Sequence, residues 1–587
     1  MNSILEFTRS FSYMKRHLGQ YKKTRRVSQI FTTIETILEL LIPMIMGLTL
    51  NTAVYSKDLG LAIKYGVLMV VLSLITMYCG MQATKNAGLT SSGMAANARE
   101  AQYKNIQRFS FEDLEYFGVP SLLTRLTSDM QQLSQSMFVS TRFVMKTVVM
   151  AVVSFVLAFK ASAKLSLIFL VAVPILFVAL MLVTTYAIPK FRQARFQYDN
   201  LNLVIEENLN NMRVIKAFVR KRYELDKFGI QNDKMFKLAD GSQGPMSYIF
   251  PIANFILFGT FVGLTYFGGI EIIEGRLGVG DLISFNMYAI MLLGSFIGLS
   301  MVLTMFMSAS PGVTRVVEVI SREPSMDNDD KVEGLELEDG SIDFDNVSFT
   351  YEEGSDTYQL EDINLHIKSG ESIGILGPTG SAKSTLVQLI PRLYDISKGS
   401  LKVGGHEVKE YDLQTLRDAV TIVLQKNTLF SGTIADNLRW GNPDASEEEI
   451  KLAATIAQAD DFVSQRHDSY ESVLGQGGSG VSGGQKQRLT IARSLLKNPK
   501  ILILDNSTSA VDTKTETAIM EGINENLKGL TKIIISQRVS SFKQADRIIV
   551  MDEGKIADIG THDELYQRND NYRMTYDIQQ QGGSDND

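Results

Sequence analysis

The stretch Glu371-Ser-Ile-Gly-Ile-Leu-Gly377-Pro-Thr-Gly-Ser-Ala-Lys383-Ser384-Thr385 indicates a phosphate-binding loop between a strand and a helix. Its apolar first part predicts a buried strand, and we expect the helix to begin near Ser381. Glycines at 377 and 380 let backbone N–H groups point at phosphate oxygens, which the positive end of the helix also attracts. Lys383 is expected to reach the β- and γ-phosphates, and the Ser384 hydroxyl to bind Mg²⁺.

Ala382 stands where such a loop usually has its last glycine. A methyl group is tolerated there if φ stays negative, and we expect a negative φ because the position precedes a helical lysine. The predicted phosphate-binding residues are Gly377, Pro378, Thr379, Gly380, Ser381, Ala382, Lys383, Ser384 and Thr385.

A second apolar run, Ile501-Leu-Ile-Leu, predicts another buried parallel strand, which delivers the carboxylate of Asp505 to its C-terminal edge. The next residue is Asn506, whose amide cannot accept a proton at neutral pH. Between the two strands lies Ser482-Gly-Gly-Gln485. This tetrapeptide is a weak motif by itself, and its position between the phosphate loop and the second strand makes it specific.

The order of these motifs resembles that of the ATP-binding cassette (ABC) family, and the resemblance extends to the whole chain. It implies ATP and Mg²⁺ as ligands and gives further residues a role. Tyr351 would stack on the base, Gln425 would sense Mg²⁺, and Asp512 would lie in the loop at the dimer interface. Asp505 would hold Mg²⁺ together with Ser384 and Gln425, usually through water.

Two positions depart from the family pattern. Asn506 replaces the glutamate that would polarise the attacking water, and Gln537 replaces the histidine that normally contacts the γ-phosphate. Asn506 is either the native residue of a specialised site or an introduced replacement of a natural aspartate. In either case, we expect slow ATP hydrolysis at this site. By contrast, Ser482, Gly483, Gly484 and Gln485 match the family signature, which caps ATP held on the phosphate loop of a second subunit. Removing a hydrolytic base costs about 10²–10⁴ in rate, so we expect a non-identical partner that supplies the missing glutamate and histidine.

Apolar stretches of spanning length fill the first half of the chain. We place six spans at about 28–54, 61–84, 140–160, 164–189, 245–272 and 281–308. Basic residues between 15 and 26, and in the long connections 85–139 and 190–244, place the N-terminus, these connections and the ATP domain in the cytoplasm. We therefore expect a multi-pass protein of the cell (plasma) membrane, and we expect no cleaved signal peptide before the first span.

The expected fold is an all-α six-helix transmembrane domain followed by an α/β P-loop nucleotide-binding domain, the ABC exporter architecture. Its parts are a cytoplasmic segment 1–27, the transmembrane domain 28–310, a linker 311–340, the nucleotide-binding domain 341–575 and a polar, frayed tail 576–587. In exporters of this plan, short transverse helices of the inner connections touch the nucleotide-binding domains. Phe111–Phe117 and Asn211–Phe218 match the family patterns for them, although either alone also reads as a plain amphipathic helix.

Composition excludes some classes of protein. One cysteine, Cys79, excludes internal disulfides and a four-cysteine metal site, and a net charge of −7 argues against nucleic acid as the main partner.

Two features of the spans concern the cargo. Glu35 and Glu39 lie one helical turn apart and could attract cationic amphiphiles, but we favour a position at the cytoplasmic end, in water or paired with a Lys or Arg. Met287, Met291 and Phe296 suggest a soft drug-binding surface, although such a stripe is also ordinary helix packing.

We therefore expect an ABC-type, ATPase-coupled translocase: one subunit of a heterodimer that moves amphipathic drugs or lipophilic compounds out of the cell. Lipid or peptide export by the same architecture is the alternative, although we expect no N-terminal peptidase domain. A third reading is a regulatory, ATP-gated membrane protein that does not pump, for which a degenerate signature would be expected. The lipid bilayer and a hydrophobic or amphipathic small molecule are the other expected partners.

Overall fold

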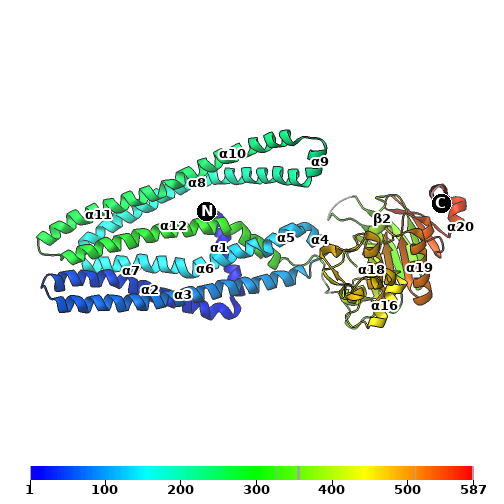
Figure 1. The fold of residues 1–587 in the computed structure, drawn as a ribbon, viewed down its shortest axis with the longest axis horizontal. Coiled ribbons are helices and arrows are strands. Elements are labelled where there is room, and N and C mark those ends of the chain that lie inside the picture. Colours follow the sequence, from blue (N-terminus) through cyan, green and yellow to red (C-terminus); the bar gives the residue numbers. More distant parts are fainter. Residues whose placement is uncertain (1, 327, 329, 353–356, 509, 585–587) are drawn as a thin grey trace. The chain divides into compact units, whose positions relative to one another are not determined.

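The computed structural model describes residues 2–326, 328, 330–352, 357–508 and 510–584, and the side chains of 2–7, 188, 192, 300, 303, 304, 307 and 581–584 are outside the description. The chain divides into two compact units (Figure 1). The first comprises Met1–Gln107 and Val119–Arg322, and the second comprises Arg108–Gly118 and Glu323–Asp587. Asp327 and Asp329, in the expected linker 311–340, lie outside the described residues.

The first unit is built from long helices. Its main elements are α2 (Lys22–Leu48), α3 (Leu59–Ile106), α6 (Ser128–Val139), α7 (Met145–Ala161), α8 (Ala163–Asn210), α10 (Lys221–Ser247), α11 (Ile249–Ile273) and α12 (Val279–Ser321). Six helical stretches of the described chain are long and apolar enough to cross a membrane. With 48 residues, α3 is about 72 Å long, more than twice the apolar thickness of a bilayer.

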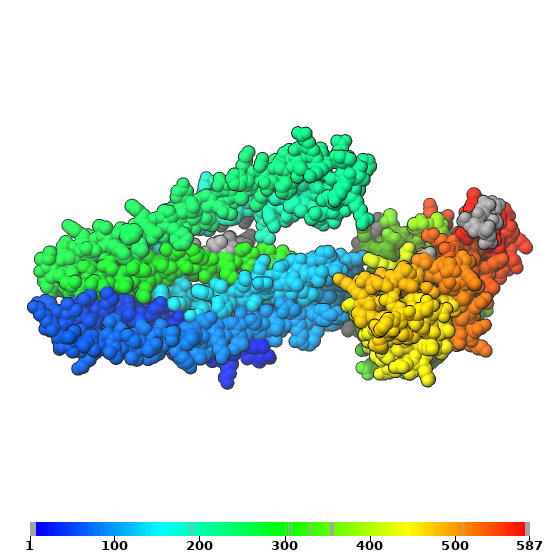
Figure 2. All heavy atoms as spheres, in the orientation of Figure 1, coloured from blue at the N-terminus to red at the C-terminus, as the bar shows by residue number. Residues whose placement is uncertain are grey.

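Helices α8 and α10 form an arm with the short helix α9 (Met212–Ala217) at its tip, and an open hollow separates much of this arm from α6 and α12 (Figure 2).

The basic N-terminal segment is helical as well. Its first helix, α1 (Asn2–Met14), buries Phe11 and Met14 against α3, α6 and α12. Ion pairs are also buried in this unit: Arg142 and Lys146 bind Glu35, at 2.5 and 3.3 Å, and Lys146 lies 2.9 Å from Glu39.

The second unit holds a six-stranded sheet in the order β12-β11-β3-β10-β9-β6 and a four-stranded antiparallel sheet in the order β2-β1-β4-β5. The strands of the larger sheet are β3 (Ser372–Leu376), β6 (Val420–Val423), β9 (Ile501–Asp505), β10 (Thr531–Ile535), β11 (Arg547–Asp552) and β12 (Lys555–Gly560). Those of the smaller sheet are β1 (Ile342–Phe349), β2 (Leu360–Ile367), β4 (Lys398–Val403) and β5 (His406–Glu407). The central strands are parallel and buried, as their continuous apolar sequence predicts.

The remaining helices of this unit flank the two sheets. They are α13 (Lys383–Leu389), α14 (Leu413–Ala419), α15 (Ile434–Arg439), α16 (Glu447–Ile456), α17 (Asp460–Ser464), α18 (Gly483–Leu495), α19 (Thr513–Asn526), α20 (His562–Arg568) and α21 (Asp570–Ser584). The short helix α4 (Phe111–Phe117) also belongs here. It contacts the unit through Phe111, whose ring lies 5.9 Å from that of Tyr394, and through Asp113, which accepts from the N–H of Ser325 at 2.8 Å.

The structure differs from three of the sequence-based boundaries. Helix α12 continues to Ser321 because Val313, Val316 and Val319 are buried on one face, so the first third of the expected linker is helical. The helix after the phosphate loop begins at Lys383 instead of near Ser381. The expected frayed tail continues α21 to Ser584.

Candidate functional site

The carboxyl ends of three neighbouring parallel strands bring the predicted nucleotide residues together. Ile535 at the end of β10 lies beside Ile375 of β3 on one side and beside Asp505 of β9 on the other. The phosphate loop, the Asp505–Asn506 pair and Gln537 follow these strand ends directly. Strand β6 pairs with β9 and ends at Val423, which places the exposed Gln425 at the same edge.

The phosphate loop curls around the side chain of Lys383. The lysine ammonium donates to the carbonyl oxygens of Gly377 and Pro378 at 2.9 and 2.7 Å and lies 3.2 Å from Ser381 Oγ. A Cβ at Gly377 would meet the Met551 carbonyl oxygen at 2.3 Å, so only glycine fits there. Burial lowers the pKa of Lys383, and the nearby charge of Asp505 opposes that shift. The group therefore loses its proton more readily than an exposed lysine.

Ala382 corrects the expected backbone conformation. Its φ is +64°, in the left-handed region, where the sequence had led us to expect a negative value. The residue is the N-cap of α13, and the chain has to turn sharply there to leave the loop and enter the helix. A left-handed alanine costs about 1–2 kcal/mol because its Cβ crowds the carbonyl oxygen, so the missing glycine leaves strain beside Lys383.

Asp505 is a buried carboxylate beside the loop, with 2% of its surface exposed. Burial raises its pKa, while the hydroxyl of Ser384 and the charge of Lys383 oppose the shift. Within the described part of the chain, its Oδ1 atom has no hydrogen-bond partner. A buried carboxylate oxygen without a partner, next to a serine hydroxyl, is the donor set that Mg²⁺ prefers, so these residues fit the metal.

Asn506 follows with a φ of +46°, and its N–H donates to the Ile535 carbonyl oxygen at 2.9 Å. Asparagine tolerates this left-handed conformation better than most residues do. The side chain therefore stands directly after the strand end, on a backbone that suits an asparagine.

The aromatic side chain of Tyr351 is held in place from two sides. Its hydroxyl lies 3.1 Å from that of Thr385 on α13, and its ring packs edge-on against Phe349 and Tyr394 at centroid distances of 4.8 and 5.1 Å. With 37% of its surface exposed, the ring keeps a face open to solvent. Tyr394 also donates to Glu115 of α4 at 3.3 Å, which connects this aromatic cluster to the short helix.

Ser482 is the N-cap of α18 and forms a reciprocal capping box with Gln485. The serine N–H donates to Gln485 Oε1 at 2.9 Å, and the Gln485 N–H donates to Ser482 Oγ at 3.3 Å. Ser482 and Gly483 are exposed, so the positive end of this helix faces outward. Gly484 is tightly packed, since a Cβ there would lie 2.7 Å from the Ala510 carbonyl oxygen.

The loop after Asn506 is tied to the signature helix, a link that sequence reasoning missed. The N–H of Ala510 donates to the side chain of Gln487 on α18 at 3.0 Å, and Gln487 is buried. Asp512 caps α19 by accepting from the N–H of Thr515 at 3.0 Å, and this hydrogen bond lowers the pKa of Asp512. Ser509, the first residue of the motif that contains Asp512, lies outside the described residues.

A second missed contact holds the loop that contains Gln537. Gln579 of α21 donates to the Gln537 carbonyl oxygen at 2.7 Å and accepts from the N–H of Val539 at 2.9 Å. Gln579 belongs to a glutamine run in a polar segment, and such a run contains no signal that singles out one residue.

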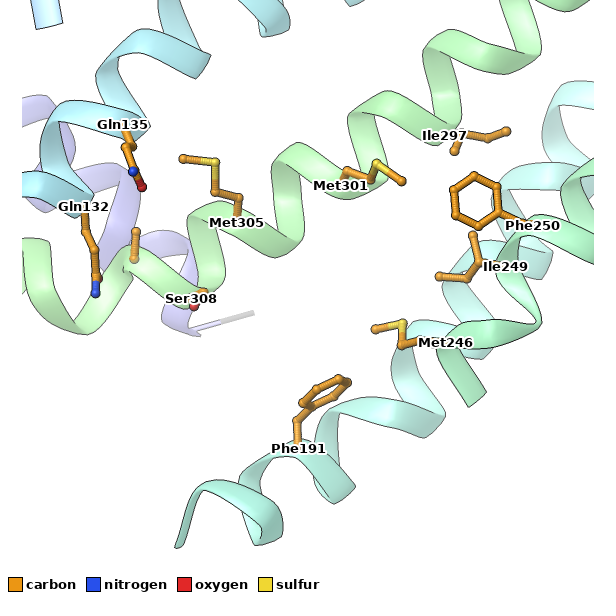
Figure 3. Close-up of a pocket in the computed structure, with 11 residues that line it drawn as sticks. Gln132, Gln135, Phe191, Met246, Ile249, Phe250, Ile297, Met301, Met305 and Ser308 are labelled. Carbon is orange, nitrogen blue, oxygen red and sulfur yellow. The ribbon is translucent and has the colours of Figure 1, made fainter. Parts of the chain in front are cut away.

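The predicted cargo residues are not gathered in one cavity. The largest cavity described in the first unit is lined by other residues, among them Met301 and Met305 of the same helix α12 (Figure 3). Met291 and Phe296 pack against apolar cores, and Met287 is 38% exposed. Glu35 is bound by Arg142 and Lys146, and Lys146 also pairs with Glu39, so of the two expected arrangements, in water or paired with a basic residue, the structure shows the ion pair.

Comparisons with known proteins agree with this architecture. The family model described as the ABC transporter transmembrane region matches residues 27–296, and the one described as ABC transporter matches residues 360–509. An uncharacterised ABC transporter ATP-binding protein of Mycobacterium tuberculosis is 33% identical over 94% of this chain and 95% of its own length. An uncharacterised ABC transporter ATP-binding protein of Bacillus subtilis is 32% identical over 96% of this chain and 97% of its own length.

A relative with a printed activity is the ATP-dependent lipid A-core flippase of Syntrophus aciditrophicus, 31% identical over 83% of this chain and 80% of its own length. The matches cover both units, and the described chain contains the six apolar helices and the nucleotide-binding sheet that such proteins require. The chain therefore belongs to the ABC transporter family, as a half-transporter that joins one transmembrane region to one ATP-binding domain.

Proposed function

We propose that this chain is one half of a heterodimeric, ATP-driven exporter whose own ATP site hydrolyses slowly. The observation that supports this most directly is the pair Asn506 and Gln537, at the ends of the adjacent strands β9 and β10. Neither side chain can take a proton from water at neutral pH. A site that lacks a general base loses about 10²–10⁴ in rate, while the loop that binds the nucleotide is present.

The residues of the loop each have a role in this proposal. The backbone N–H groups of the phosphate loop hold the phosphates, and Lys383 neutralises the β- and γ-phosphate oxygens. Thr385 keeps Tyr351 in position to stack on the base. Ser384, Asp505 and Gln425 hold Mg²⁺, which supplies charge neutralisation on the phosphates. Asn506 orients a water molecule without deprotonating it, so ATP stays bound through many cycles of the partner.

The signature serves the partner. Ser482 and Gly483 are exposed at a helix N-terminus, the arrangement that binds a phosphate group. In the assembled pair, this surface caps ATP on the phosphate loop of a non-identical half-transporter, which supplies the glutamate and the histidine missing here. Asp512 lies at the same interface.

We propose an amphipathic or lipophilic compound as the cargo, moved outward across the cell membrane. Lipid export is the second candidate, favoured by the similarity to the lipid A-core flippase. A purely regulatory, non-pumping role accords poorly with a signature whose capping geometry is complete.

A comparison of two variants tests the division of labour. In the assembled pair, obtained by co-purification and identification of the second subunit, Ser482→Ala should reduce ATPase activity more than Lys383→Ala does. The reason is that Ser482 serves the competent site, whereas Lys383 serves the slow one. The chain purified alone should bind Mg-ATP and hydrolyse it slowly. Vigorous turnover by the isolated chain, or greater loss from Lys383→Ala, would contradict the proposal.

A further inference from the structure

Glu516 is a buried carboxylate in the first turn of α19, and none of the roles proposed above uses it. A negative charge is favourable near the N-terminus of a helix, but an exposed side chain gains the same benefit. Burial of a charge is costly unless the charge is paired and hydrogen-bonded. The buried position of Glu516 is therefore explained by its contacts with other residues and not by its helix.

The Glu516 carboxylate contacts both loops that follow the central strands at the proposed ATP site. Its Oε1 atom accepts from the hydroxyl of Thr508 at 2.5 Å, and its Oε2 atom lies 3.6 Å from Nη1 of Arg538. Thr508 is two positions after Asn506, in the loop that follows β9. Arg538 is the next residue after Gln537, in the loop that follows β10. One side chain thereby holds both loops.

Arg538 closes a ring of contacts around the loop 507–512. Its Nη1 atom donates to the carbonyl oxygen of Val511 at 3.1 Å. The loop is therefore held at two points, at Thr508 by the carboxylate and at Val511 by the guanidinium, and both of these residues are buried. Because the ion pair of Glu516 and Arg538 joins the two points, a shift of the loop changes the geometry of the pair.

The loop 507–512 also packs on the first turn of the signature helix α18. Between the two holding points, the N–H of Ala510 donates to the side chain of the buried Gln487 at 3.0 Å. The carbonyl oxygen of Ala510 lies so close to Gly484 that a Cβ there would be 2.7 Å from it. Gly484 is two positions after Ser482, the serine proposed to cap the partner's ATP. The same loop therefore helps to set the place of Ser482.

The two charges of the pair differ in their exposure. The side chain of Arg538 is 43% exposed, whereas that of Glu516 is 4% exposed. Water can hydrate the guanidinium, but the carboxylate needs a cation, and among the described side chains Arg538 lies within ion-pair distance of it. The distance of 3.6 Å is longer than that of a direct hydrogen bond. A displacement of Gln537, the neighbour of Arg538, changes this distance, so the pair responds to movement of the second loop.

We propose that Glu516 and Arg538 form a positioning pair that fixes the loop 507–512 between Gln537 and the signature helix α18. The inference rests on the proposed function and adds to it two residues whose role needs no contact with the nucleotide. With the pair intact, Ser482 keeps one position toward the partner's ATP. Without the pair, ATP still binds to both phosphate loops, but the signature caps the partner's ATP less accurately. The rate of hydrolysis should therefore fall, while the affinity for ATP should not.

A double variant separates positioning from the cost of a buried charge. Arg538→Gln alone leaves the buried Glu516 without a cation, so a loss of activity would not separate the two effects. Glu516→Gln together with Arg538→Gln removes both charges, and the shorter glutamine at 538 no longer reaches Val511. This double variant should unfold close to the temperature of the unmodified chain but leave the loop 507–512 loosely held.

The matched control is a second glutamate–arginine pair of the same unit. Arg547 Nε donates to Glu371 Oε1 at 2.5 Å, and the glutamate side chain is mostly buried. Glu371 directly precedes β3 and Arg547 begins β11, at the edge of the sheet opposite to the ATP loops. Glu371→Gln together with Arg547→Gln therefore removes a comparable ion pair without changing a contact of the loop 507–512.

Hydrogen exchange of the full-length chain alone, in lipid nanodiscs without ATP, tests the hold on the loop. A hydrogen bond to a charged group stabilises by at least about a tenfold factor. The Glu516/Arg538 double variant should therefore exchange about tenfold faster or more in peptides that cover 507–512, with a smaller increase in 482–488. The control variant should exchange like the unmodified chain. Unchanged exchange in the 507–512 peptides of the double variant would overturn the proposal.

ATPase kinetics of the assembled pair test the effect on catalysis. The double variant should lower kcat by about tenfold or more, as small misplacements near a reacting centre do, with an unchanged KM for ATP. An unchanged kcat, or an equal fall of kcat in the control variant, would overturn the proposal. A failure of the divided-labour proposal would look different: the unmodified pair would hydrolyse ATP at both sites, while the difference in exchange, which needs no second subunit, would remain.

Discussion

Gln579, near the end of α21, donates to the main-chain carbonyl oxygen of Gln537 at 2.7 Å. The same side chain accepts from the N–H of Val539 at 2.9 Å, so one residue fixes both sides of the loop that follows β10. The last helix of the described chain thereby holds Gln537, the residue that we propose to stand in the place of the family's γ-phosphate histidine. In a site proposed to retain ATP, such a contact keeps the loop in one position.

Gln579→Ala should release this loop. Each neutral hydrogen bond contributes about 1 kcal/mol, so loss of the two should speed hydrogen exchange in the peptide 536–542 by about thirtyfold. Thr575→Ala is the control, because the Thr575 hydroxyl donates within α21, to Asn571. Unchanged exchange in the Gln579 variant would mean that the loop is held by other contacts.

Asn506→Glu should raise turnover at this site only modestly, by less than about tenfold. The glutamate has to adopt the left-handed backbone conformation of Asn506, which costs about 1–2 kcal/mol, and Gln537 still lacks a histidine. The measurement is ATPase activity of the assembled pair with the partner's site inactivated. Asn506→Gln controls for side-chain length without a base. Turnover equal to that of a competent site would show that Asn506 was the sole defect.

Ala382→Gly should stabilise the nucleotide-binding unit. Relief of the left-handed strain is worth about 1–2 kcal/mol, and the greater freedom of glycine in the unfolded chain offsets about 0.5–1 kcal/mol of it. We expect a net gain of about 0.5–1 kcal/mol in the thermal unfolding of this unit within the full-length chain. Ala454→Gly in the interior of α16 should instead lose about 1 kcal/mol. A loss at Ala382 as well would contradict the strain argument.

Asp505→Asn should separate stability from metal binding. Burial raises the pKa of Asp505 above its ordinary 3.8, so the fold favours the protonated acid. The contribution of Asp505 to the free energy of unfolding is therefore complete at pH values below the pKa that this residue has in the unfolded chain. It is lost as the pH rises through the pKa that the residue has in the folded chain. At pH 8 the asparagine variant should therefore have a higher unfolding temperature than the unmodified chain, and the difference between the two temperatures should shrink as the pH falls. The variant should also lose Mg²⁺-dependent ATP binding. A margin independent of pH would exclude titration of Asp505 as its cause.

Arg142→Gln should destabilise the first unit by about 3–5 kcal/mol, because it leaves the buried Glu35 without its main partner. Adding Glu35→Gln in the same chain should recover most of this loss, since the uncompensated charge is then removed. Lys104→Gln breaks the exposed pair with Glu100 and should leave the unfolding temperature almost unchanged, because solvent screens this pair. Thermal unfolding in nanodiscs measures all three. No recovery in the double variant would mean that Arg142 acts through packing.

Local patterns in the sequence are sufficient to predict the elements of this protein. The apolar spans, the strand–loop–helix around Lys383 and the strand that ends at Asp505 each depend on neighbouring residues, whose backbone preferences are set by short-range sterics and hydrogen bonds. The structure confirms these elements, together with the ABC fold that they imply.

The tertiary structure decided what depends on contacts between distant residues. Arg142 binds Glu35 from 107 positions away, Gln579 holds Gln537 from 42 positions away, and the cavity is lined by Met301 and Met305 instead of Met287 and Met291. The sign of φ at Ala382 also follows from how the loop joins its helix. Which face of a helix meets a neighbour, and which turn absorbs strain, depends on the packing of the whole unit, which local sequence patterns do not encode.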